Sequence, residues 1–138
     1  LTRFQPLSAS GENEIDAAVG AVISDDMVEP EILGLGRPKG IGTARMGLAV
    51  RMSGRTSGVV DGSIIAMDVT VQVGLPTGAG AWFVHQIATT RMAQPGDSGS
   101  LLVDTRIRAV GLVFAGSETI SLANEIQRVL SRLDVSLV

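Results

Sequence analysis

A serine between glycines is the residue of this chain with the clearest potential for chemistry. Ser98 lies in Gly96-Asp97-Ser98-Gly99-Ser100, between two apolar runs. Glycines permit a tight turn that directs the hydroxyl outward and gathers backbone N–H groups where an oxyanion can be held. The pattern predicts Ser98 as a nucleophile and the N–H groups of Gly96 and Ser98 as oxyanion donors; the alternative is an ordinary glycine turn.

The base that this serine needs is not obvious. A hydroxyl is a weak nucleophile until a base accepts its proton, and His85 is the single histidine of the chain. Alternation along a strand places His85 on the same face as Phe83 and Ile87. We therefore expect a strand histidine with a local hydrogen bond rather than a catalytic base. A lone histidine also offers no metal site, and no metal or organic cofactor is expected.

The composition favours one globular, mainly β domain. The 138 residues are 45% apolar, include 17 glycines and no cysteine, and carry a net charge of −3. Glycines between short β-branched runs are typical of an all-β fold, and the charge gives no reason to expect nucleic acid. No apolar run reaches the roughly 18 residues that a membrane span needs. We expect a soluble protein, and the lack of cysteine slightly favours the cytoplasm.

Apolar spacing and turn signals outline the elements that must position Ser98. Two strands, 1–7 and 15–23, joined by a polar turn, form a leading hairpin. Turns at 53–54, 54–58, 76–80 and 95–96 separate the later strands, and 58–73 can also form one bent strand. The later strand candidates are 46–52, 58–68, 69–73, 82–90, 101–104 and 109–114.

The last element is predicted to be an amphipathic helix. Ile126, Val129, Leu130 and Leu133 follow the i, i+3, i+4, i+7 spacing of one helix face. Asn124 is a plausible N-cap. We expect this apolar stripe to pack on the β body.

Several segments together resemble the chymotrypsin/trypsin-like serine proteases, especially their bacterial, cysteine-free members. Gly96-Asp97-Ser98-Gly99 matches the nucleophile motif of the family, and Asp16-Ala17-Ala18-Val19 is similar to the run that opens with its triad aspartate. Gly111-Leu112-Val113-Phe114-Ala115-Gly116 begins thirteen residues past Ser98 and resembles the family's substrate-binding strand. With the final helix, the resemblance extends from about residue 15 to the end.

The resemblance implies an all-β fold, a six-stranded antiparallel barrel that is the second barrel of such a protease, with a leading hairpin and a C-terminal helix. Residues 1–30 are then the remnant hairpin of a first barrel and its linker, and residues 31–138 the C-terminal barrel with its closing helix. The family's histidine precedes its aspartate in sequence, so it is expected outside this chain. We expect a serine endopeptidase acting through an acyl-enzyme, of which this chain is a portion that is inactive alone. The expected partners are a peptide or protein substrate and either the missing N-terminal barrel or another copy of the chain.

The resemblance also assigns roles to individual residues. Asp16 is expected to orient the histidine, with a plain hairpin aspartate as the alternative. Asp97 is expected to form a buried ion pair that shapes the oxyanion turn, with a solvated turn aspartate as the alternative. The resemblance also implies an apolar specificity pocket suited to apolar or small side chains, and a strand that pairs with substrate. The residues expected to form them are Met92, Ala93, Val113, Phe114, Ala115 and Gly116.

A different class of function is compatible with the same residues. A fold does not determine a function, and a chain without the expected base can be a non-catalytic binding or scaffold module on a protease-like barrel. In sequence upstream of this chain, a histidine in a short motif that is preceded by strand-like segments favours the enzyme over the module.

Overall fold

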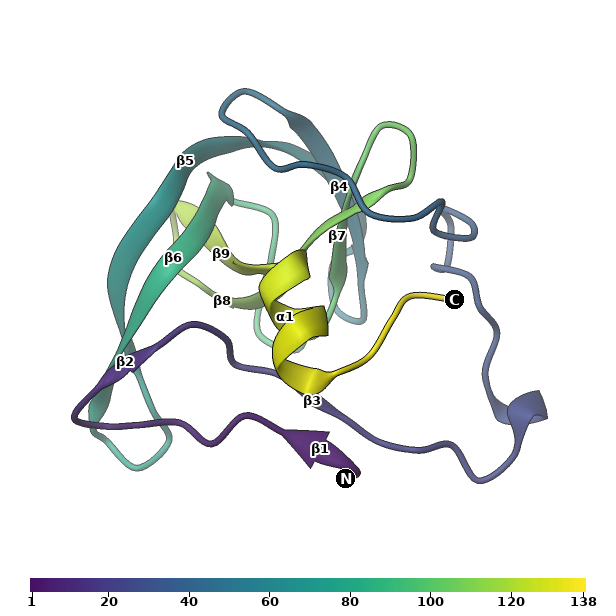
Figure 1. The fold of residues 1–138 in the computed structure, drawn as a ribbon. Coiled ribbons are helices and arrows are strands. Elements are labelled where there is room, and N and C mark those ends of the chain that lie inside the picture. Colours follow the sequence, from purple (N-terminus) through teal and green to yellow (C-terminus); the bar gives the residue numbers. More distant parts are fainter.

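Six antiparallel strands form the body of the molecule. The computed structural model describes residues 1–138 (Figure 1). The strands lie in the order β6-β5-β4-β7-β8-β9, and β9 also pairs with β6, which closes the ring. The predicted six-stranded antiparallel barrel is therefore confirmed. Its strands are β4 (Ala49–Gly54), β5 (Gly58–Gly74), β6 (Gly80–Thr90), β7 (Leu101–Asp104), β8 (Ala109–Gly116) and β9 (Ile120–Glu125).

The number of strands was predictable, but their membership differs from the prediction. The predicted alternative of one bent strand over 58–73 is confirmed as the 17-residue strand β5, whose pairing with β6 shifts register at three places. The sixth strand is β9, which the sequence pattern did not reveal. Its residues Ser121 and Asn124 are polar yet buried at 2% and 0% exposure, so the usual alternation of polar and apolar residues is missing.

The predicted helix is present, but its predicted cap is wrong. Helix α1 (Ile126–Leu133) buries Ile126, Val129 and Leu133. The N-cap position is Glu125, without a side-chain capping bond, because Asn124 lies inside β9 with its side chain turned into the protein. No helix in the structure is both long and apolar enough to cross a membrane.

The core is divided into three adjoining clusters. The barrel interior centres on Met52, Ile64, Ile87 and Leu102. A second cluster joins α1 to Ile15 of the leading segment, and a third surrounds Phe83. The helix and the leading segment thus share a core with the barrel rather than lying loosely upon it.

The leading segment is less regular than the predicted hairpin. Strands β1 (Arg3–Phe4) and β3 (Ala18–Val19) form a two-residue antiparallel pair in place of two long strands. Between them, β2 (Glu12–Asn13) adds in parallel to β6. The chain then passes through a short 3₁₀ helix, η1 (Asp25–Met27), before it enters β4. Figure 1 shows this segment running along one end of the barrel, past α1.

His85 occupies an irregular part of β6. It has φ +61° and is exposed, whereas Phe83 and Ile87 are fully buried. The predicted shared face is therefore wrong, because the register shifts between β5 and β6 interrupt the alternation. Its Nδ1 lies 2.5 Å from a carboxylate oxygen of Asp68, which confirms the prediction of a local hydrogen bond.

Candidate active site

The turn that carries Ser98 joins β6 to β7 and is fastened to β8. The N–H of Gly99 donates to the carbonyl of Val113 at 2.7 Å, and the N–H of Val113 donates to the carbonyl of Ser100 at 2.9 Å. Gly96 and Gly99 have φ values of +103° and +91°, a region that favours glycine. The glycines of the motif therefore serve the backbone conformation that the sequence predicts.

Two N–H groups of this turn have no partner inside the chain. Neither Gly96 nor Ser98 donates its backbone N–H to any acceptor, whereas the intervening Asp97 N–H donates to the carbonyl of Gln94 at 3.0 Å. Both Gly96 and Ser98 are exposed. Exposed backbone donors beside a serine hydroxyl are able to bind an oxyanion if they point to the same place.

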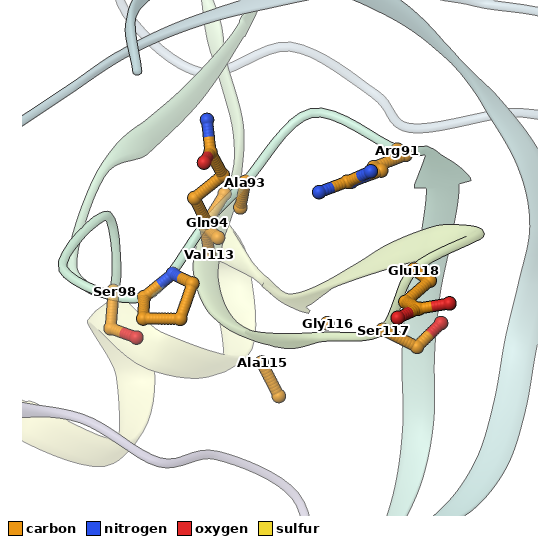
Figure 2. A pocket seen from close by; sticks show the side chains of 10 residues that line it. Arg91, Ala93, Gln94, Ser98, Val113, Ala115, Gly116, Ser117 and Glu118 are labelled. Carbon is orange, nitrogen blue, oxygen red and sulfur yellow. The ribbon is translucent and has the colours of Figure 1, made fainter. Parts of the chain in front are cut away.

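The first cavity at Ser98 has a volume of about 400 Å³ (Figure 2). One wall comes from the segment between β6 and the turn, and the other from the end of β8 and the residues after it. Figure 2 shows Arg91 and Glu118 at the end away from Ser98. The lining residues are Arg91, Ala93, Gln94, Pro95, Ser98, Val113, Ala115, Gly116, Ser117 and Glu118.

This lining corrects the predicted placement of Met92 and Phe114. Met92 does not line the cavity, because its side chain is 4% exposed and packs in the barrel core. Phe114 packs against Phe83 with ring centroids 4.9 Å apart and faces a different cavity. The other four predicted residues, Ala93, Val113, Ala115 and Gly116, are among the ten that line the cavity, together with the charged side chains of Arg91 and Glu118.

The second cavity, of about 570 Å³, brings Asp16 and Ser98 together. The leading segment supplies Asp16, Ala17 and Ala18, and the nucleophile turn supplies Ser98 and Gly99. The backbone N–H of Asp16 donates to the side-chain oxygen of Asn124 at 3.0 Å, which fixes this part of the segment to β9. Although Asp16 is exposed, neighbouring groups partly displace water from its carboxylate, and this desolvation raises its pKa. His85 lines neither cavity.

Asp97 is fully buried, and hydrogen bonds replace the predicted ion pair. No cationic side chain or amino terminus lies within ion-pair distance of its carboxylate. Burial by itself raises the pKa of Asp97. The Ser57 hydroxyl and the N–H groups of Gln94, Ser57 and Thr56 outweigh burial, and they lower the pKa to about 2. The alternative of a solvated aspartate is also wrong, because Asp97 has 0% exposure.

Sequence reasoning treated residues 54–58 only as a turn, so it missed Thr56 and Ser57. The Thr-Ser pair signals hydroxyl side chains that can form hydrogen bonds in a turn, but not that their partner is Asp97. No group of three or more His, Asp or Glu side chains has a geometry that could hold a metal ion.

The structure thus combines a closed antiparallel barrel with a glycine-flanked serine, two unbonded N–H groups and an adjoining cavity. No protein-family model matches the chain. Streptogrisin-D of Streptomyces griseus is 44% identical over 78 residues, which are 55% of this chain and 18% of that protein.

Solved structures show the same likeness. The chymotrypsin of Cellulomonas bogoriensis is 28% identical with a TM-score of 0.64, covering 77% of this chain and 58% of that one. Protease A of Thermobifida fusca is also 28% identical with a TM-score of 0.64, covering 74% of this chain and 54% of that one. The predicted resemblance to the chymotrypsin/trypsin-like serine proteases is confirmed in sequence and in fold. The chain spans little more than half the length of these solved relatives, and the matched segment is under a fifth of Streptogrisin-D.

Proposed function

We propose that this chain is the nucleophile-bearing C-terminal barrel of a serine endopeptidase. The observation that carries the proposal is the position of Ser98, exposed beside two unbonded backbone donors and lining a cavity of about 400 Å³. A substrate side chain can enter that cavity while its carbonyl carbon faces the serine hydroxyl. Such an arrangement suits acyl transfer.

The proposed reaction has two stages. A histidine supplied from outside this chain takes the proton of Ser98 as Oγ attacks the scissile carbonyl carbon, and Asp16 steadies the resulting imidazolium. The N–H groups of Gly96 and Ser98 hold the negative oxygen of the tetrahedral intermediate. The imidazolium then gives its proton to the leaving amine, which leaves an ester on Ser98. Water, activated by the same histidine, hydrolyses that ester and restores the enzyme.

The end of β8 is proposed to bind the substrate backbone. β9 pairs Ala115 with Leu122 and Gly116 with Ser121, while the pairing of β8 with β7 ends at Leu112. Because Val113 is bonded to Gly99 and Ser100, the edge that no strand or turn covers is that of Ala115 and Gly116, beside the cavity. An extended peptide can add to such an edge through backbone hydrogen bonds.

The second cavity is the place where the missing histidine would act, since it has Asp16 on one side and Ser98 on the other. We propose that residues 1–30 are the last hairpin and linker of a first barrel, and that residues 31–138 form the second. Exposed apolar side chains on the leading part fit a contact with the absent barrel or with another copy, notably Phe4 (60%), Ile23 (93%) and Met27 (64%). The chain alone should then have little activity, since removal of a triad member costs roughly 10⁴-fold or more in rate.

A serine-directed fluorophosphonate tests the proposal. It should label the natural protein that contains both this chain and its upstream sequence, and Ser98→Ala should abolish the label. Ser100→Ala is the matched control, because it removes a nearby hydroxyl that makes no hydrogen bond. Labelling that persists in Ser98→Ala would show that the nucleophile is elsewhere.

The alternative is a non-catalytic binding module on a protease-like barrel. It is favoured by the placement of His85, the only histidine of the chain, which lines neither cavity. A module should bind extended peptides at β8 without acylation at Ser98. Absence of labelling in the natural protein, together with peptide binding, would support the module over the protease.

A further inference from the structure

The turn between β4 and β5 is interlocked with the turn that carries Ser98. One oxygen of the Asp97 carboxylate accepts the N–H of Thr56 at 2.8 Å and the N–H of Ser57 at 3.1 Å. The other accepts the Ser57 hydroxyl at 2.6 Å and the N–H of Gln94 at 2.8 Å. Three of these four donors come from the β4–β5 turn, about forty residues before Asp97 in the chain.

The two turns are also in close steric contact. A Cβ atom on Gly54 would lie 2.3 Å from an Asp97 carboxylate oxygen, and one on Gly96 would lie 2.4 Å from the Thr56 hydroxyl. That hydroxyl donates to the carbonyl of Pro95 at 2.9 Å. The β4–β5 turn therefore touches the nucleophile turn at Pro95, Gly96 and Asp97.

Ser57 has a special place among these donors. Its hydroxyl supplies the only side-chain hydrogen bond to Asp97, and the same oxygen accepts the Gln94 side-chain amide at 3.1 Å. Since the hydroxyl has one proton, the Gln94 amide directs that proton to the carboxylate. Hydrogen bonds to a buried charged group are stronger than those between neutral groups.

We infer that Ser57 is a positioning residue, which through Asp97 sets the direction of the Gly96 and Ser98 N–H groups toward the substrate oxygen. Asp97 lies between these two residues, so a displacement of its side chain turns the peptide group that carries the Ser98 N–H and shifts the backbone at Gly96. All four donors are neutral groups of this barrel. The oxyanion turn is thus formed without a cationic partner, and its formation needs no newly created amino terminus. The catalytic meaning of this inference rests on the proposed function.

Amide hydrogen exchange of this chain tests the positioning directly. The readout is the protected N–H groups of Asp97, Gly99 and Ser100, each of which has a backbone acceptor. Ser57→Ala should speed their exchange by about 10- to 100-fold, the range expected when a charged group loses one hydrogen bond. Ser57→Thr keeps the hydroxyl and should retain slow exchange. Ser63→Ala removes an unbonded hydroxyl from β5 and should leave exchange unchanged.

A second readout separates positioning from simple support of the fold. In the natural protein, Ser57→Ala should lower kcat or the labelling rate of Ser98 by about tenfold or more with little change in KM, because the oxyanion forms only during reaction. Ser57→Thr should restore the rate. If Ser57→Ala does not fold, Thr56→Val takes its place, since it removes the bond to Pro95 and should speed exchange in the same segment.

The outcomes are distinct. Unchanged exchange together with an unchanged kcat in Ser57→Ala overturns the inference while leaving the protease proposal intact. A natural protein that never labels at Ser98 refutes the protease proposal, whereas the exchange comparison still decides whether Ser57 holds the turn.

Discussion

The hydroxyl of Ser98 donates to the backbone carbonyl of Phe114 at 3.2 Å. Bonds between a hydroxyl and an oxygen are usually about 2.7–2.8 Å long, so this one is weak. The carbonyl belongs to β8, not to a base, and it cannot accept the proton during reaction. The serine is thus held by an interaction that a nearby imidazole can readily displace.

Added imidazole should therefore increase the reaction of this chain with a fluorophosphonate. The cavity of about 570 Å³ between Asp16 and Ser98 can admit the small base. Because free imidazole lacks the positioning of a tethered histidine, we expect an increase of about tenfold or less. The rate is measured by mass spectrometry across imidazole concentrations. An equal increase in Ser98→Ala would mean that another residue reacts.

The stability of the fold should fall below about pH 4. Asp97 has its pKa lowered to about 2, and hydrogen bonds and Arg108 lower the pKa of the buried Asp104 against the effect of burial. A carboxylate with a depressed folded-state pKa stabilises the fold above its unfolded pKa, and this contribution is lost as pH falls through the folded value. For Asp97 the loss is about 2 kcal/mol between pH 4 and 2. Urea unfolding against pH measures it, and Asp97→Asn should flatten the profile.

Asp16 should contribute with the opposite sign. Desolvation raises its pKa, so the folded state binds the proton more tightly than the unfolded state, and stability gains slightly as the group protonates. An Asp16→Asn variant should therefore have a steeper loss of stability on acidification than the wild type. A shallower profile in that variant would mean that the folded state lowers the pKa of Asp16 instead of raising it.

Gly96→Ala should damage both stability and reactivity. The residue has φ +103°, and its added methyl group would lie 2.4 Å from the Thr56 hydroxyl. Strain of this kind costs about 1–3 kcal/mol, and its relief would move an oxyanion donor. Gly74→Ala is the control, because a Cβ there meets nothing within 4 Å. Thermal unfolding and the labelling rate should change in the first variant only.

Asn124→Ala should destabilise the contact between the leading segment and the barrel. Its side chain accepts the N–H of Asp16 at 3.0 Å and donates to the side-chain oxygen of Gln86 at 2.7 Å, with no exposure to water. Each buried group left without a partner costs about 1–3 kcal/mol. Gln127→Ala, on the exposed face of α1, is the control and should change stability by less than about 0.5 kcal/mol. Denaturant unfolding compares the two.

Two charged side chains at one end of the first cavity predict its preference among substrates (Figure 2). Arg91 and Glu118 both line it and form no ion pair with each other. Arg91→Ala should reduce kcat/KM for substrates with an acidic side chain before the scissile bond, and Glu118→Ala for those with a basic one. Since both residues are exposed, each effect should be up to about fivefold. Peptide substrates that differ only at this position provide the measurement.

The barrel and the nucleophile turn could be predicted because their signals are local. The glycines around Ser98, at φ +103° and +91°, are visible in a five-residue motif. The helix is visible in the spacing of Val129 and Leu133 along α1. Strand β9 could not be predicted, because Ser121 and Asn124 are buried polar residues whose partners come from distant segments.

The partners of Asp97 were unpredictable for a related reason. Its donors at Thr56 and Ser57 are neutral groups about forty residues away, and nothing in composition distinguishes a neutral set of donors from a cation. Met92 was misplaced because an apolar residue near the nucleophile can face either the cavity or the core. Gly62 leaves space for its sulfur, since a Cβ at that glycine would lie 2.6 Å from it.

Arg3, in the leading segment, binds the C-terminal end of helix α1. Its guanidinium donates to the carbonyls of Leu133 and Asp134 at 2.9 and 2.6 Å, across 130 and 131 residues of sequence. Because the contact joins residues so far apart in sequence, it forms only after both segments have been synthesised. The last turn of α1 therefore becomes ordered late in biosynthesis. Cleavage after Phe4 would strip those carbonyls of their donor and loosen the helix end, even though the cut lies far from it in sequence.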